Sequence, residues 1–166
     1  MAEPIICDTS VWLYLGRINL AELLSRLYDP VYTTEAVCQE LDIGRESRPD
    51  ILDPGNLPWV QLVQPSPSNL ANLPTNRLGK GEQSVLAYAQ ANNLPIVGLD
   101  DRQARELAFK LGLHVVGTVG LLLRAKERGL IEAIRPLLTQ LQQEGFYISE
   151  PLLNYALQKA QEADSA

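Results

Sequence analysis

Short apolar segments without charge alternate with longer amphipathic segments along most of this chain, and this alternation limits the available folds most strongly. The segments PIIC, PIVGL and HVV carry no acidic or basic side chain apart from one histidine, as buried strands should. Strands separated by helices of about ten residues or more form crossovers between parallel neighbours. The sequence therefore predicts an α/β protein with a mostly parallel sheet covered on both faces by helices.

The apolar spacing also predicts where the elements lie. We expect strands at residues 4–7, 31–34, 59–63, 95–99 and 113–117, and helices at 9–28 with a break at Gly16, 35–43 with an end at Gly44, 81–93, 101–112, 118–129 and 131–143. A long loop region at 44–81 is rich in Pro, Asn, Ser and Gly, and a C-terminal helical extension covers about 145–163. With 166 residues, we expect one domain over 1–166.

Composition excludes several classes of protein. The chain has neither an apolar run that would span a bilayer nor a signal peptide, so we expect a cytoplasmic protein without membrane contact. Two cysteines without CxxC spacing and one histidine argue against a disulfide framework and a zinc site. A net charge of −6 argues against coating nucleic acid by bulk electrostatics, but it is compatible with a nuclease that concentrates carboxylates around a metal ion.

Acidic residues stand where parallel α/β folds build their sites, at or just beyond the carboxyl ends of strands. Asp8 follows the first expected strand, and Asp100 with Asp101 follows the fourth. Glu40 and Glu82 lie on expected helices, Glu82 in a first turn. Each also has a purely structural explanation, because aspartates cap helices, the helix dipole favours a glutamate in the first turn, and a lone helical glutamate is usually solvated.

The combination of these positions indicates more than any one of them. Two strand ends that each finish in aspartate bring carboxylates to one edge of the sheet, and like charges held close together are costly unless a cation neutralises them. A donor set made of oxygen atoms suits Mg²⁺ or Mn²⁺. The sequence therefore predicts a divalent-metal site at this edge.

The order of the motifs resembles the PIN domain family. The matching segments are IICDTS, the glutamate of VCQEL, the glutamate of GKGE, GLDD with the following AR, and GTVGLLLRAKERGLI. They run from about Ile5 to Ile131, and they are most similar to the prokaryotic PIN-like branch related to toxin–antitoxin ribonucleases. The resemblance implies a three-layer α/β/α sandwich and a magnesium- or manganese-dependent nuclease that cuts single-stranded RNA.

The resemblance also assigns roles to residues. It implies catalytic roles for Asp8, Glu40, Glu82, Asp100 and Asp101, metal binding by Asp8, Glu82, Asp100 and Asp101, and supporting roles for Ser10, Arg105 and Thr118. Ser10 matches the polar residue that supports the first aspartate. Either Asp100 or Asp101 is the chief ligand at the fourth strand.

Contacts to RNA are expected from cations near the acidic positions, above all Lys80 and Arg102. Further candidates in the long loops are Arg45, Arg48 and Arg77, and the aromatic residues considered for base stacking are Trp12, Tyr14 and Tyr32. The competing explanations are solvated charge or internal ion pairs for the cations and core packing for the aromatic residues and for His114.

Two other interpretations compete with the PIN-like nuclease, and the sequence argues against the first. An aspartate after the first strand also begins phosphotransfer enzymes of the haloacid-dehalogenase kind, but these need a second aspartate where Ser10 stands. The stronger alternative is a catalytically inactive PIN-like module that binds protein or RNA. If the chain is a toxin, it has a small antitoxin partner, and the apolar faces of residues 20–27 and 152–157 are candidate surfaces for that partner or for a homodimer.

Overall fold

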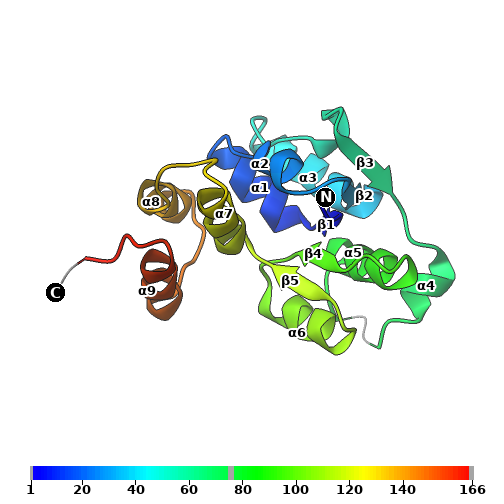
Figure 1. Cartoon of the computed structure of the whole chain (residues 1–166). Helices are drawn as coiled ribbons and strands as arrows, with labels where there is room; N and C mark the ends of the chain where they lie inside the picture. Colours follow the sequence, from blue (N-terminus) through cyan, green and yellow to red (C-terminus); the bar gives the residue numbers. More distant parts are fainter. Residues whose placement is uncertain (1, 75–76, 165–166) are drawn as a thin grey trace.

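The computed structural model describes residues 2–74 and 77–164. Within them, five parallel strands form one sheet in the order β3-β2-β1-β4-β5. The strands are β1 (Ile5–Cys7), β2 (Val31–Thr34), β3 (Val60–Val63), β4 (Ile96–Gly98) and β5 (His114–Val116). The predicted fold class is confirmed, because helices cover both faces of this all-parallel sheet (Figure 1).

The helices are α1 (Thr9–Arg17), α2 (Leu23–Leu27), α3 (Glu35–Ser47), α4 (Pro67–Ala71), α5 (Lys80–Ala91), α6 (Arg102–Lys110), α7 (Thr118–Glu127), α8 (Arg135–Gln143) and α9 (Glu150–Lys159), with a 3-10 turn, η1, at Pro54–Asn56. Helix α1 packs against α3 and α7 on one face of the sheet, and α5 packs on β1, β2 and β4 on the other. Helix α9 packs against α7, at the side of the molecule away from α4 (Figure 1).

The two central strands carry the start of the site. Strands β1 and β4 are buried along their whole length, and Cys7 pairs with Gly98 at their carboxyl ends. The Asp8 backbone N–H donates to the Gly98 carbonyl at 2.9 Å, so β1 and β4 end side by side. Residues that follow β1 and β4 are therefore neighbours, as expected for parallel strands.

Several boundaries differ from the sequence-based expectation. The break expected at Gly16 is wrong, because Gly16 lies inside α1 and the chain leaves the helix only at residues 18–22, before α2. Helix α3 begins as predicted, with Thr34 Oγ1 accepting from Val37 N at 3.1 Å, but it continues through Gly44 to Ser47. The Ile51 side chain packs over Gly44, which gives the helix a partner there. The predicted loop region contains η1 and α4, and α8 begins at Arg135 rather than at residue 131.

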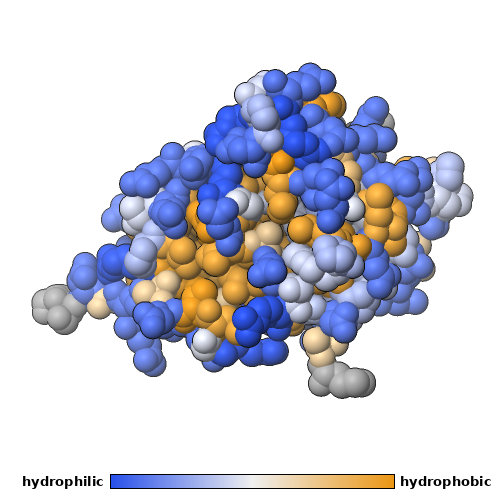
Figure 2. Space-filling model, turned by 90° about the horizontal axis from the view of Figure 1, so that it is seen from above, coloured by the Kyte–Doolittle hydropathy of each residue, from blue (hydrophilic) through white to orange (hydrophobic). Residues whose placement is uncertain are grey.

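His114 was expected inside a buried strand, and this prediction is wrong. It is exposed because β5 is the edge strand of the sheet, with β4 as its one neighbour. Of the described helices, none has the length and apolar character needed to cross a membrane. Hydrophilic side chains cover most of the face seen in Figure 2, with a broad apolar area to the left of its centre.

Candidate active site

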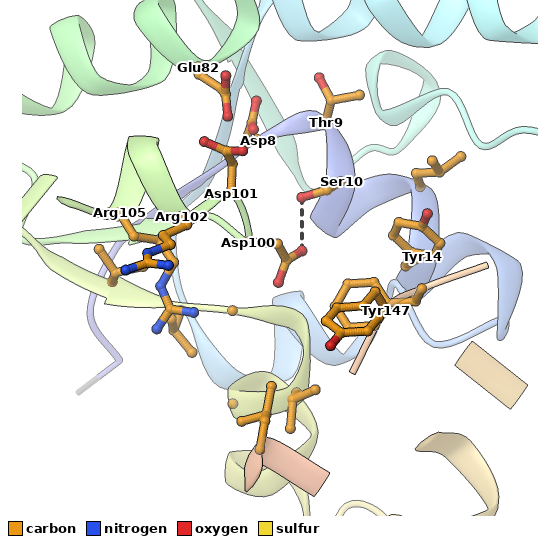
Figure 3. A pocket seen from close by; sticks show the side chains of 18 of the residues that line it. Asp8, Thr9, Ser10, Tyr14, Glu82, Asp100, Asp101, Arg102, Arg105 and Tyr147 are labelled. Atoms are coloured by element: carbon orange, nitrogen blue, oxygen red, sulfur yellow. Dashed lines mark hydrogen bonds between the residues drawn. The ribbon is translucent and has the colours of Figure 1, made fainter. Parts of the chain in front are cut away.

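A cleft of about 910 Å³ lies at the carboxyl edge of the sheet, and all five acidic residues of the predicted site line it. They come from four parts of the fold: Asp8 follows β1, Glu40 lies on α3, Glu82 lies on α5, and Asp100 and Asp101 follow β4. Figure 3 shows the side chains of Asp8, Glu82 and Asp101 close to one another, and that of Asp100 turned toward Ser10. The topology thus gathers carboxylates that are far apart in the sequence.

Asp8 is the most buried of the five, with 5% of its surface exposed. It occupies the N-cap position of α1, but its side chain accepts no capping hydrogen bond, and Oδ1 is buried without a partner in the described structure. Burial raises the pKa of Asp8 to about 7, a hydrogen bond from the Thr9 backbone opposes this shift, and the charges of Glu82, Glu40 and Asp100 add to it. Helix capping therefore does not explain this aspartate.

Glu40 is held by two donors at opposite ends of its carboxylate. Thr9 Oγ1 donates to Oε2 at 2.6 Å, and the Gly81 backbone N–H donates to Oε1 at 2.8 Å. A Cβ on residue 81 would lie 2.8 Å from Glu40 Oε2, so a side chain there would collide with the carboxylate. Glycine at position 81 lets α5 approach α3 closely enough to fix Glu40.

Glu82 lies in the first turn of α5, where Oε1 accepts from the Gly79 backbone N–H at 3.1 Å. Burial raises the pKa of Glu82, the Gly79 hydrogen bond lowers it, and the nearby Asp101 and Glu40 raise it further. The side chain therefore stabilises the helix start and also faces the other carboxylates of the cleft.

Asp100 has the most complete set of donors. Ser10 Oγ donates to Oδ2 at 2.8 Å, Thr118 Oγ1 donates to Oδ2 at 2.7 Å, and the Thr118 backbone N–H donates to Oδ1 at 2.7 Å. A Cβ on Gly117 would lie 2.9 Å from Asp100 Oδ1. Ser10, which was expected to support Asp8, donates to Asp100 instead.

Asp101 makes different hydrogen bonds from Asp100. It is the N-cap of α6, and its Oδ2 accepts from the Ala104 backbone N–H at 3.0 Å. The structural explanation offered by the sequence, capping of this helix, therefore holds for Asp101 and not for Asp100. The second oxygen of Asp101 takes no part in that cap, and the side chain points toward Glu82 in Figure 3.

In the positions that they occupy here, the carboxylates do not form a complete set of metal ligands. Among the described residues, no three His, Cys, Asp or Glu side chains are arranged so that they could hold a metal ion. Like charges repel, and hydrogen bonds from α1, α5 and α7 hold Glu40 and Asp100, while Asp101 caps its own helix. The donor chemistry nevertheless fits a hard divalent cation, because the set offers oxygen atoms alone and includes the orphaned Asp8 Oδ1.

The predicted cations divide into two groups. Arg102 and Arg105 line the cleft, and in the described part of the chain Arg105 donates no hydrogen bond to an acidic side chain. Lys80 lines a separate cavity of about 330 Å³ beside Glu35 and Gln64. Of the arginines expected in the long loops, Arg45 lies in α3 and pairs with Asp42 and Asp53. Arg48 pairs with Asp50 and Glu144, and Arg77 lies outside the cleft.

The aromatic residues considered for stacking are mostly engaged in packing. Trp12 is fully buried and donates to Thr33, and the Tyr32 ring packs on Tyr88. Tyr14 lines the cleft but is half-buried against Phe146, with ring centroids 4.8 Å apart.

Three cleft residues that the sequence did not single out are Tyr147, Tyr155 and Arg124. Tyr147 is 83% exposed and Tyr155 is 56% exposed. The apolar faces considered for docking also differ from each other, because the leucines of α2 are buried against α7 whereas Leu152 of α9 lines the cleft.

Comparison with known proteins gives one family match. A family model described as a PIN domain matches residues 4–162. The match includes all five strands of the sheet and every residue of the acidic cleft. No curated protein sequence gives a significant match.

Proposed function

Because this chain belongs to the PIN domain family, whose fold is of the nuclease type, we propose that it is a divalent-metal-dependent endoribonuclease acting on single-stranded RNA. PIN domains are generally nucleases that use divalent metal ions. The reaction would be hydrolysis of a phosphodiester bond with Mg²⁺ or Mn²⁺ as the cofactor.

The observation that supports this proposal most is the environment of Asp8. A carboxylate oxygen without a partner is buried at the floor of a cleft, and three other carboxylates push the pKa of the same group upward. Such an arrangement is unfavourable for folding unless a cation offsets the charge. Strained arrangements of this kind are concentrated at functional sites.

In this proposal Asp8 anchors the cation and Glu82 with one of the two aspartates after β4 completes the protein ligands. The second oxygen of Asp101 faces Glu82, whereas Asp100 would have to share oxygens that Ser10 and Thr118 already occupy. Ser10 and Thr118 would then hold Asp100 in a fixed orientation. Glu40, fixed by Thr9 and Gly81, would orient polar groups at the opposite wall.

A divalent cation, when bound, would supply positive charge beside the phosphodiester and would lower the pKa of water, so that hydroxide could form and attack near neutral pH. The carboxylates of the cleft would accept the proton that the attacking water loses. Attack by water rather than by the ribose 2′-hydroxyl would leave 5′-phosphate ends.

The test is cleavage of a labelled single-stranded RNA by the wild type, by Asp8→Asn and by Glu82→Gln, with Mg²⁺ or with a chelator. We expect cleavage that needs the cation and is at least about 10²-fold slower in Asp8→Asn. Glu46→Gln is the matched control, because Glu46 is an exposed carboxylate on the same helix as Glu40. Cleavage that survives chelation or the Asp8 substitution would contradict the proposal.

The competing function is an inactive PIN-like module that binds RNA or protein. It is favoured by the hydrogen bonds that already hold Glu40, Asp100 and Asp101. Binding of RNA by the wild type without any cleavage in Mg²⁺ or Mn²⁺ would support this module and exclude the nuclease.

We also propose that, as in the toxin–antitoxin branch, a small inhibitor protein covers the cleft. The exposed side chains of Leu152 and Tyr155 on α9 would supply the apolar contact for it. A small protein encoded next to this chain that stops RNA cleavage when added in equimolar amount would support this partner.

A further inference from the structure

A second hollow continues from the acidic cleft along α6. It has a volume of about 700 Å³ and shares Asp100, Arg102, Arg105, Tyr147 and Leu152 with that cleft. One wall is α6, and the other is the segment that leads into α9. We call this hollow the α6 groove.

Helix α6 presents one face to the α6 groove. Arg105 and Glu106 lie three and four residues after Arg102, and Phe109 lies four and three residues after them, so the four side chains share one side of the helix. Phe109 is 80% exposed, which is unusual for a phenylalanine ring on a helix of a folded protein. On the opposite wall stands Tyr147, 83% exposed.

The cations of the α6 groove are available for a ligand. Arg102 pairs with Glu106 at 3.4 Å, which leaves Arg105 and Lys110 without an ion pair in the described part of the chain. The whole chain carries a net charge of −6, so two unpaired cations in one groove are a local exception. Figure 3 shows Arg102 and Arg105 to one side of Asp100 and Tyr147 to the other.

From this geometry, and resting on the proposed ribonuclease activity, we propose that the α6 groove holds the single-stranded RNA where it leaves the acidic cleft. Phe109 and Tyr147 stack on unpaired bases, and Arg105 and Lys110 contact the phosphates. Exposed aromatic rings beside unpaired cations are the features that bind single-stranded nucleic acid without strong sequence preference. Three cations against the carboxylates of Asp100 and Glu106 leave the groove with an excess of positive charge, which favours RNA over an apolar helix of a partner protein as the occupant.

The experiment measures RNA affinity separately from cleavage. Fluorescence anisotropy with a labelled single-stranded RNA is recorded in chelator on the Asp8→Asn protein, which holds the RNA intact. Phe109→Ala and Tyr147→Ala, each added to this background, should weaken binding by about 5- to 100-fold, the usual effect of losing one stacked base. Because both rings are exposed, neither change should lower the melting temperature noticeably.

Three controls make the result specific. Phe109→Tyr and Tyr147→Phe keep the ring and should keep the affinity within about twofold. Ile43→Ala removes an exposed apolar side chain outside the groove and should have no effect. An RNA with abasic sites should bind the unsubstituted and the Ala-substituted proteins equally weakly, because it has no bases to stack.

Lys110→Ala tests the phosphate contact. It should reduce the slope of log affinity against log salt concentration by about 0.7, the value for one phosphate of a single strand. Unchanged affinity in both aromatic variants, or an equal loss in Ile43→Ala, would overturn the α6 groove as the RNA path. So would variants that lose binding of an inhibitor protein but keep RNA.

Failure of the groove and failure of the enzyme are distinguishable. If the wild type cleaves RNA but the aromatic variants bind it normally, the groove is wrong and the nuclease stands. If the aromatic variants lose RNA binding but the wild type never cleaves, the groove is supported as an RNA-binding surface and the nuclease is wrong.

Discussion

Glycines at positions 81 and 117 face carboxylates so closely that a side chain would have no room. A Cβ would come within 2.8 Å of Glu40 Oε2 in one case and within 2.9 Å of Asp100 Oδ1 in the other. Neither glycine has a positive φ angle, so the backbone does not require glycine there. The requirement comes from the acidic residues, which indicates that the chain keeps them in fixed positions.

Gly81→Ala should therefore lower both stability and activity. Alanine in a helix normally stabilises it relative to glycine by about 0.5–1 kcal/mol, but here the collision with Glu40 should cost about 1–3 kcal/mol. Urea unfolding and the cleavage rate measure the two effects. Gly44→Ala is the matched control, because it lies inside α3 and meets only the flexible end of Ile51. If Gly81→Ala were as stable and as active as the control, Glu40 would not be held in the way described.

Asp8→Asn should stabilise the protein in chelator at pH 8. The pKa of Asp8 rises from its usual value of 3.8 to about 7 in the folded state, chiefly by burial. The folded protein therefore binds this proton more tightly than the unfolded chain, and the free energy of unfolding falls as the pH rises between these two values. Asparagine avoids this cost, which we expect to be about 2–4 kcal/mol above pH 7.

Urea unfolding of both proteins at pH 4 and pH 8 checks this. The advantage of Asp8→Asn should be large at pH 8 and should nearly disappear at pH 4, where the wild-type carboxyl is protonated in the folded state. Equal stability of the two proteins at pH 8 would mean that Asp8 is not a strained carboxylate.

Asp8, Asp100 and Asp101 could be located from the sequence because they follow buried strands, and parallel strands end at one edge. Glu40 and Glu82 lie on helices, and only the family resemblance pointed to them. The sequence did not separate Asp100 from Asp101, since the distinction depends on Ser10 and Thr118, which reach Asp100 from other elements. Phe109 and Tyr147 were also missed. No local sequence pattern indicates these two residues, because the groove between them forms only when the C-terminal segment folds back toward α6.

At the scale of elements, the central strands were predictable because burial on both faces excludes charged residues from them. The edges were less predictable. Strand β5 is as apolar as β4 apart from His114, yet its exposure depends on having a single neighbour. The end of α3 depends on Ile51 packing over Gly44, a contact that the glycine itself does not reveal.

One carboxylate joins the last three helices. Glu162 follows α9, and its side chain accepts from Lys126 Nζ on α7 at 2.8 Å, from Ile134 N at 2.8 Å and from Arg135 N at 3.0 Å at the start of α8. It thereby holds α9, one wall of the cleft, against its neighbours.

Glu162→Ala should cost about 1–3 kcal/mol, because it leaves several donors without their acceptor. Hydrogen exchange should accelerate in α8 and α9 while the amides of β1 and β4 stay protected. Glu132→Ala, at an exposed position nearby, is the control. Unchanged exchange in α9 would show that apolar packing alone holds this helix.

For the whole molecule, negative charge dominates and is concentrated where a metal ion would bind. The chain has 20 acidic and 14 basic residues, and five of the acidic ones line a single cleft. A divalent cation would offset this charge locally, while Arg105 and Lys110 in the α6 groove offer the cationic path that RNA needs. The two hollows therefore have complementary roles in the proposed reaction.

The central claim is that the acidic cleft binds a divalent cation through Asp8. Titration of Mn²⁺ into the protein, followed by the electron paramagnetic resonance signal of the free ion, tests this without any RNA. The wild type should remove the free signal saturably and Mg²⁺ should compete, whereas Asp8→Asn should leave the signal unchanged. Equal binding by the two proteins, or none by the wild type, would contradict this claim.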